Sequence, residues 1–208
     1  MLRYLDVQNI LDKNDLILQE SGCVGSENER GNTYMKKIGI VTDSHSSISQ
    51  EEAEKLGIFV LPMPFYIDGE CFYESVTLSR ELFFEKLAAG ADITTSQPSP
   101  TAVMEIWDKA LEQFEKILYM PISSGLSGSY ETAMMLAKDE AYEGRVLVVD
   151  DGQVAAPLHQ MVLDTLDMIE KGYEAEQIRD LLERAGDRMM IYIALQTLEC
   201  LKKGGRVT

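Results

Sequence analysis

Short apolar runs that end in polar residues alternate with helix-like segments along most of this chain. The runs at 36–42, 117–122 and 145–150 are rich in aliphatic residues, and each leads into hydroxyl or carboxylate side chains. Continuous apolar runs of this length are typical of parallel strands that are buried on both faces of a sheet. Strands that alternate with helices predict an α/β fold with a parallel sheet, which binds ligands at the carboxyl ends of its strands.

Helical periodicity and end signals place helices between these strands. The predicted helices cover residues 50–56, 79–89, 101–114, 131–138, 157–171 and 174–185. Further strands are predicted at 58–62, 65–67 and 190–195, with Asp68-Gly69 as a turn.

Residues 1–34 differ from the rest of the chain. A short amphipathic stretch is followed by a polar, glycine-containing run, so we expect this extension to be a linker or disordered. The regular pattern begins at Met35, a candidate native start, and predicts an α/β domain of three layers over 35–153. We expect residues 154–208 to begin a second α/β domain that is cut short.

The charge balance is strongly acidic. The chain holds 19 Lys and Arg against 35 Asp and Glu, a net charge of −16. Nucleic acids and anionic membrane surfaces need clustered positive charge, so neither is an expected partner. No apolar stretch reaches the roughly 20 residues that span a bilayer.

The cysteine and histidine content argues against a metal site. Cys23, Cys71 and Cys200 are far apart, and the only histidines are His45 and His159. A structural zinc site is therefore not expected, and neither is any other metal. Unpaired cysteines and the lack of a secretory signal predict a reduced, cytoplasmic protein.

A hydroxyl-rich turn, Ser123–Tyr130, joins the run at 117–122 to a helix. It contains four serines and two glycines. Such a turn gathers hydroxyl groups and the unpaired N–H groups of a first helical turn, where partial positive charge favours an anion. A plain polar loop with Ser129 as the helix N-cap is the simpler interpretation.

A second hydroxyl-rich turn, Thr94–Pro100, precedes another predicted helix. Alone, it would indicate only the start of that helix. Two such turns in one domain predict a small-molecule site whose ligand has an acidic group at one end.

Enzymatic function is an alternative. Ser127, Asp150 and His159 occur in the chain order of a hydrolase triad, although Asp150 and His159 are close in sequence. The Gly-x-Ser-x-Gly elbow is incomplete, because Ser129 stands where its second glycine would be. The common phosphate-binding glycine motifs do not occur. A serine hydrolase that uses Ser127 and a non-catalytic regulatory module both remain open.

A set of short motifs follows a fixed order along the chain. They are Ile40–Ser44, Val60–Pro62 with Ile67–Gly69, Thr95–Ser99, Ser123–Tyr130, Val148–Asp150 and Thr197–Arg206. Together they resemble the DegV family, the fatty-acid-binding proteins of the FakB type, over residues 35–208. The resemblance implies a DegV-like α/β protein of two domains.

The resemblance also implies a function. It implies a carrier that buries one long-chain fatty acid, needs no cofactor and is not an enzyme. It assigns the carboxylate contacts to Thr95 and Ser127, and it places Arg206 in the same polar network. The implied partner is a separate fatty-acid kinase that converts the bound carboxylate to an acyl phosphate. The chain departs from the family pattern at Asp151-Gly152, where a serine usually follows the strand aspartate.

Overall fold

The computed structural model describes residues 36–74, 76–192, 198, 201–202 and 204–206. All of them belong to the unit Lys36–Thr208. The predicted disorder of residues 1–34 lies outside the described residues, as do residues 193–195 of the predicted strand at 190–195. The described part of that strand, residues 190–192, is not in a strand.

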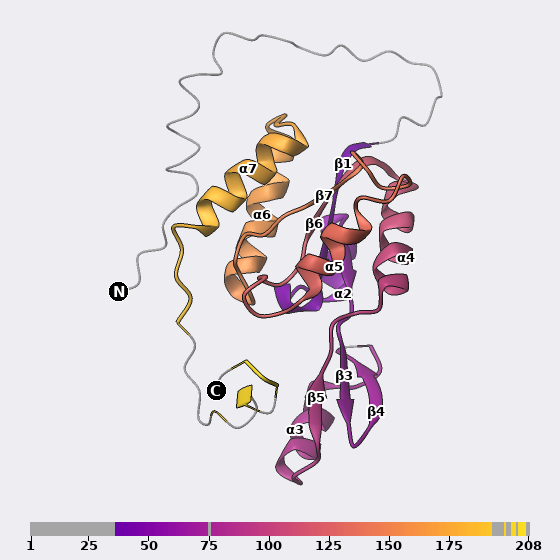
Figure 1. Cartoon of the computed structure of the whole chain (residues 1–208), viewed down its shortest axis with the longest axis vertical. Helices are drawn as coiled ribbons and strands as arrows, with labels where there is room; N and C mark the ends of the chain where they lie inside the picture. The colour runs from indigo at the N-terminus through magenta and orange to yellow at the C-terminus, as the bar shows by residue number, and fades with distance from the viewer. Residues whose placement is uncertain (1–35, 75, 193–197, 199–200, 203, 207–208) are drawn as a thin grey trace. The chain divides into compact units, whose positions relative to one another are not determined.

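A four-stranded parallel sheet forms the centre of the fold (Figure 1). Its order is β2-β1-β6-β7, with β1 at Lys36–Asp43, β2 at Phe59–Leu61, β6 at Phe114–Met120 and β7 at Val146–Val148. Val41 of β1 lies opposite both Phe59 and Tyr119, and Ile117 lies opposite Val146. The predicted mixed α/β class with a parallel sheet is therefore confirmed.

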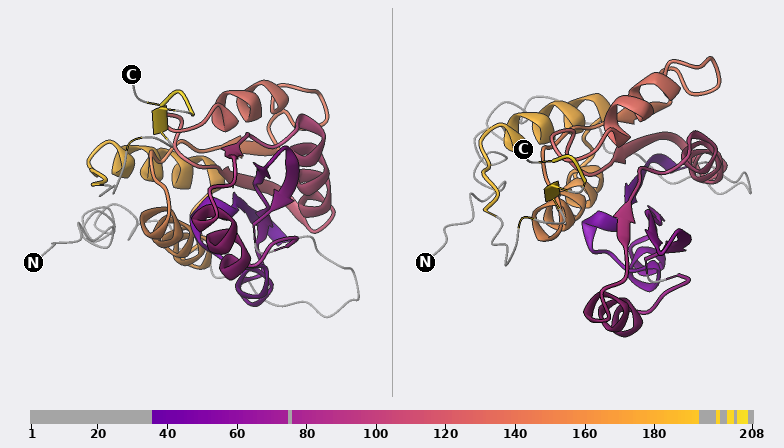
Figure 2. Two further views of the ribbon diagram at one scale, coloured as in Figure 1. Left: turned by 90° about the horizontal axis from the view of Figure 1, so that it is seen from below. Right: turned by 60° about the horizontal axis from the view of Figure 1, so that its bottom comes forward.

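Helices pack against this sheet and make three layers (Figures 1 and 2). They are α2 (Gln50–Leu56), α4 (Pro100–Leu111), α5 (Ser129–Leu136), α6 (Ala156–Glu170) and α7 (Ala175–Gly186). Side chains alternate across β6: Tyr119 meets α4, whereas Met120 accepts a weak hydrogen bond from Thr165 of α6, with 3.6 Å between Oγ1 and Sδ. Helices α6 and α7, which we placed in a second domain, thus form the third layer of the first sheet. Where a second domain begins remains a prediction.

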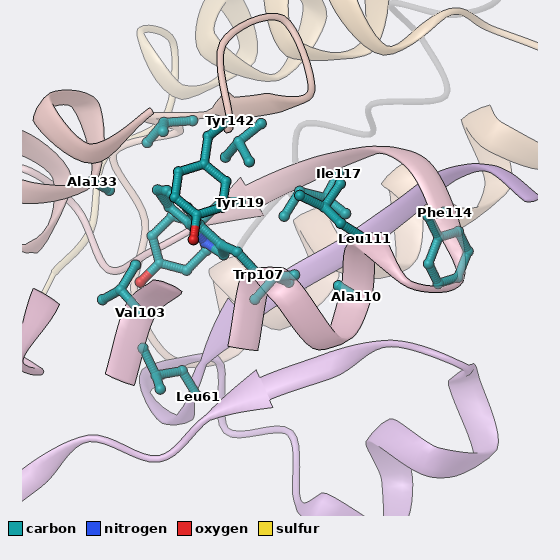
Figure 3. Close-up of a cluster of buried hydrophobic side chains, with 13 residues drawn as sticks. Leu61, Val103, Trp107, Ala110, Leu111, Phe114, Ile117, Tyr119, Ala133 and Tyr142 are labelled. Carbon is teal, nitrogen blue, oxygen red and sulfur yellow. The ribbon is translucent and has the colours of Figure 1, made fainter. Parts of the chain in front are cut away.

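An aromatic cluster fills the space between α4 and the sheet (Figure 3). Trp107 is fully buried, and its ring centroid lies 5.4 Å from Tyr119 and 5.2 Å from Tyr142. The interplanar angles of 72° and 78° are edge-to-face arrangements, which aromatic rings prefer. The Tyr142 hydroxyl donates a hydrogen bond to the Asp108 carboxylate at 2.9 Å. The polar group of this ring therefore has a partner at the edge of the cluster.

A separate antiparallel sheet carries the Thr94–Pro100 turn at one strand end. Its order is β4-β3-β5, with β3 at Pro64–Ile67, β4 at Glu70–Tyr73 and β5 at Ile93–Thr95, and helix α3 (Arg80–Ala88) precedes β5. The predicted turn joins β3 to β4 and has positive φ at both central residues, 51° at Asp68 and 85° at Gly69. Positive φ at both positions is the type I′ geometry that matches strand twist. Strands β4 and β5 are not among the strands predicted from the sequence.

The boundary between α4 and β6 differs from the prediction. The helix predicted over 101–114 ends at Leu111, and the strand predicted at 117 begins at Phe114. Phe114 pairs opposite Lys36, and its ring lies over Gly39, where a Cβ would come within 2.6 Å of the ring. Pairing with β1 therefore extends the strand backwards into residues whose local pattern favours a helix.

Ala155, at the start of α6, has a strained backbone. Its φ of 56° and ψ of −134° lie in a region that favours glycine. We expect Ala155→Gly to raise the free energy of unfolding by about 1 kcal/mol, because relief of strain outweighs the added chain entropy. Urea unfolding measures the change. Ala156→Gly, inside α6, is the control and should lower stability; equal effects of both substitutions would contradict the strain.

Candidate functional site

The serine turn lies at the amino end of α5, as predicted. Ser127 donates its N–H to the Ser123 carbonyl at 3.2 Å, and its hydroxyl lies 2.9 Å from the Ser129 hydroxyl. The Ser127 hydroxyl also accepts the Ser129 N–H at 3.3 Å. Gly128, not Ser129, is the N-cap, and no side chain caps the helix. The half-buried Ser127 hydroxyl is therefore held beside the first N–H groups of α5.

Carboxylates at the strand ends hold this turn in place. Asp43, at the end of β1, is fully buried and accepts the N–H groups of His45 at 2.9 Å and Ile122 at 2.8 Å. Asp150, after β7, accepts the Ser124 N–H at 3.3 Å. The carboxyl ends of β1, β6 and β7 are thus joined by side chain to backbone hydrogen bonds.

Removal of the Asp43 carboxylate should destabilise the protein. Asp43→Ala leaves the buried N–H groups of His45 and Ile122 without acceptors, and we expect the free energy of unfolding to fall by about 2 kcal/mol. Urea unfolding measures the loss. Asp43→Asn keeps one acceptor oxygen but turns an amide NH2 group towards the other N–H, so it should also lose stability. An alanine variant as stable as the unchanged protein would contradict this account.

The Thr94–Pro100 turn contacts α5 through Gln97, for which no site role is predicted from the sequence. Thr95 is exposed at the end of β5, opposite Phe65 of β3. Two residues later, the Gln97 amide Nε2 donates to the Thr132 hydroxyl of α5 at 3.1 Å. The structure therefore joins the Thr94–Pro100 turn to the helix that follows the serine turn.

Arg206 also reaches the serine turn. Its Nε donates to the Leu126 carbonyl at 3.4 Å, and its Nη1 donates to the Gly204 carbonyl at 3.2 Å. Leu126 directly precedes Ser127, so an exposed guanidinium lies beside the predicted carboxylate donor. That Thr95, Ser127 and Arg206 together bind a carboxylate stays a prediction.

Acidic groups face the same region. Burial raises the pKa of Tyr130, in the first turn of α5, and the charges of Glu183 and Asp150 raise it further. Burial likewise raises the pKa of Glu183. An anionic ligand at this point needs hydroxyl, N–H and guanidinium donors to offset these acids, which matches the predicted donor set.

The residues of the alternative triad have other partners. The Ser127 hydroxyl bonds to Ser129, and the His159 Nε2 lies 3.3 Å from the Glu52 carboxylate. Asp150 accepts backbone N–H groups from Ser124 and Gly152. Nothing in this arrangement activates Ser127 as a nucleophile, because its hydroxyl needs a base within hydrogen-bond reach.

The loop after β7 contains a buried acid. Asp151 is 1% exposed, and its Oδ1 accepts the Gln153 N–H at 2.9 Å, whereas its Oδ2 has no hydrogen-bond partner. Burial raises the pKa of this carboxyl to about 7, and the charges of Asp150 and Asp43 add to the effect. The sequence had marked Asp151 only as a departure from the family pattern.

The described residues form neither a metal-binding cluster nor a helix that could span a membrane. Among them, no group of three or more His, Cys, Asp or Glu side chains could hold a metal ion. No described helix is both long and apolar enough to cross a membrane.

A groove of about 640 Å³ lies between α2, β2 and α4, lined by apolar residues such as Ile58, Val60 and Ile106. Neither hydroxyl-rich turn lines this groove.

Comparison with known proteins decides the family. Residues 37–208 match the family model described as "Uncharacterised protein, DegV family". The chain belongs to the DegV family. A DegV domain-containing protein of Caldanaerobacter subterraneus is 31% identical over 84% of this chain and 62% of the relative. Another from Streptococcus pneumoniae is 34% identical over 83% and 61%. The chain thus spans less than two thirds of these DegV relatives.

Solved DegV structures resemble this one. A fatty-acid-binding DegV family protein from Thermus thermophilus is 32% identical, with a TM-score of 0.71 over 81% of this chain and 60% of that one. A stearic-acid-binding protein from Eubacterium ventriosum is 25% identical, with a TM-score of 0.61 over 72% and 52%. The DegV identity expected from the ordered motifs is therefore confirmed.

Proposed function

We propose that this DegV protein binds a long-chain fatty acid and presents its carboxylate to a separate kinase. The kinase transfers the terminal phosphoryl group of ATP to a carboxylate oxygen, which yields an acyl phosphate and ADP. The protein acts as the carrier, and Thr95, Ser127 and Arg206 bind the carboxylate.

One observation carries this proposal. In a chain 32% identical to a fatty-acid-binding DegV protein, Arg206 lies beside the serine turn, 3.4 Å from the Leu126 carbonyl. A cation that reaches this point from far along the chain supports an anion site there, because it supplies positive charge next to the residue that precedes Ser127.

The chemistry of a fatty acid suits such a site. The carboxylate is ionised near neutral pH, and each charge-assisted hydrogen bond contributes about 1.5–3 kcal/mol. Each buried methylene of the tail adds about 0.8 kcal/mol. The tail therefore supplies affinity, whereas the hydroxyl groups and Arg206 set the orientation that a kinase would need.

Ligand binding is the direct test. Lipid extraction of the protein purified from bacteria should release a long-chain fatty acid, detected by mass spectrometry. Thr95→Val and Ser127→Ala should each weaken fatty-acid binding about tenfold, because each removes a hydrogen bond to a charged group. Thr94→Val and Ser124→Ala are matched controls from the same turns and should bind nearly as the unchanged protein does. Equal losses in controls and site variants would contradict the assigned donors.

The remaining functions predict other results. A serine hydrolase would react with a fluorophosphonate probe at Ser127, and His159→Ala would abolish that labelling. A protein that neither carries nor binds fatty acid and resists the probe would favour the regulatory module.

Presentation of the bound carboxylate is tested by adding a bacterial fatty-acid kinase and ATP. Acyl phosphate should form only if this protein is present.

A further inference from the structure

The Gln97 side chain connects the Thr94–Pro100 turn to Gly128 of the serine turn and to Thr132 of α5. The Gln97 backbone is held on both sides: Ser96 donates its N–H to the Pro64 carbonyl at 3.4 Å, and the Ser99 hydroxyl caps α4 by accepting the Ala102 N–H at 3.2 Å. The buried Pro98 lies between them. These contacts fix the backbone position from which the Gln97 side chain extends.

The amide group of the Gln97 side chain contacts the first turn of α5. Its Nε2 donates to the Thr132 hydroxyl at 3.1 Å. Its Oε1 lies over Gly128, where a Cβ would come within 3.0 Å of that oxygen. Thr132 also donates its own N–H to the Gly128 carbonyl at 3.1 Å, so the contact spans one whole turn of the helix.

This contact adjoins the proposed carboxylate donors on both sides. Gly128 directly follows Ser127, and Gln97 lies two residues after Thr95. Thr95 belongs to the antiparallel sheet, whereas Ser127 belongs to the turn that follows the parallel sheet. The distance between the Thr95 and Ser127 hydroxyl groups therefore depends on the position of the Thr94–Pro100 turn relative to α5.

We propose that Gln97 is a positioning residue for carboxylate recognition: its amide, bonded to Thr132 and packed on Gly128, sets the relative position of the Thr95 and Ser127 hydroxyls. This inference rests on the proposed function and adds to it a residue that need not touch the ligand. Hydrogen-bond donors are effective only when they are held at the correct distance and angle, so loss of the link should weaken head-group recognition alone.

A pair of ligands that share a tail separates positioning from general structure. Dodecanoate carries the charged head group, and 1-dodecanol carries the same chain length without it. Calorimetry with the whole chain should show that Gln97→Leu weakens dodecanoate binding roughly tenfold, as expected when a charge-assisted hydrogen bond is lost. Binding of 1-dodecanol should stay unchanged.

Variants of Thr132 test the same link from the helix. Thr132→Val keeps the shape of the side chain but removes the acceptor, and it should reproduce the effect of Gln97→Leu. Thr132→Ser restores a hydroxyl and should bind dodecanoate as the unchanged chain does. The double variant Gln97→Leu with Thr132→Val should be no worse than either single variant, because both remove one interaction.

Two results would overturn the inference. One is unchanged dodecanoate binding in both Gln97→Leu and Thr132→Val. The other is an equal loss of dodecanoate and 1-dodecanol binding, which would indicate a merely structural role.

Failure of the proposed function looks different. In that case the unchanged chain would bind no dodecanoate, and the proposed role of Gln97 in carboxylate recognition would be refuted as well. The link itself is tested without ligand by NMR, where Gln97→Leu and Thr132→Val should both shift the amide resonances of Thr95 and Ser127. Unshifted resonances would refute the link whatever the chain binds.

Discussion

Asp151→Asn should raise the free energy of unfolding by about 4 kcal/mol at pH 8 and by less than about 1 kcal/mol at pH 4. Burial raises the pKa of this carboxyl from 3.8 to about 7 in the folded protein. The folded state therefore keeps the proton up to about pH 7, whereas the unfolded chain releases it near 3.8. Stability of the unchanged protein falls as the pH rises through this interval, because the folded state binds more protons. Asparagine resembles the neutral carboxyl and avoids that loss.

Urea unfolding at a series of pH values measures this effect. The profiles of Asp151→Asn and the unchanged protein should converge towards pH 4 and separate steadily up to about pH 8. Asp150→Ala is the neighbouring control: one Asp150 carboxylate oxygen, Oδ1, accepts the N–H groups of Ser124 and Gly152, so its loss should lower stability. Parallel profiles of Asp151→Asn and the unchanged protein from pH 4 to pH 8 would show that Asp151 does not hold its proton.

Gly186→Ala should lower the free energy of unfolding by about 3 kcal/mol or more. A Cβ on Gly186, the last residue of α7, would lie 2.1 Å from the Asp151 carbonyl oxygen and 2.7 Å from its carbonyl carbon. Both atoms belong to the backbone, so no side-chain rotation can relieve the overlap. The helix end and the loop after β7 must move apart, and this cost exceeds the roughly 1 kcal/mol that alanine gains over glycine in a helix.

The control for this substitution is Gly125→Ala. A Cβ on Gly125 would meet only the Ser123 hydroxyl, at the ordinary contact distance of 3.6 Å. We expect this variant to unfold within about 1 kcal/mol of the unchanged protein. If Gly186→Ala were equally mild in urea unfolding, α7 would not pack on the Asp151 backbone as the structure shows.

Much of the fold could be predicted because its signals are local. The apolar run at 36–42 and the helix predicted at 50–56 match β1 and α2 closely. The Asp68-Gly69 turn was also evident, since few residues adopt positive φ readily. Strands β4 and β5 were missed because they are short and mostly exposed, so pairing with β3 rather than an apolar pattern makes them strands.

The candidate site was only partly evident from the sequence. The two hydroxyl-rich turns and the resemblance that assigned Thr95, Ser127 and Arg206 came from short motifs. Gln97 lay within one of those motifs, but its partner Thr132 is 35 residues away. Asp151 had no signal of its own, because its raised pKa results from burial among elements that are separate in sequence.

The α/β class, the DegV motifs and the positions of both hydroxyl-rich turns can be read from local sequence patterns. Each of these depends on neighbours within one strand, one turn or one helix end. Three contacts become visible only in the folded chain: Gln97 with α5, Arg206 with Leu126 across 80 residues, and α6 and α7 with the first sheet. They arise from the packing of whole elements, whose relative positions no local propensity encodes.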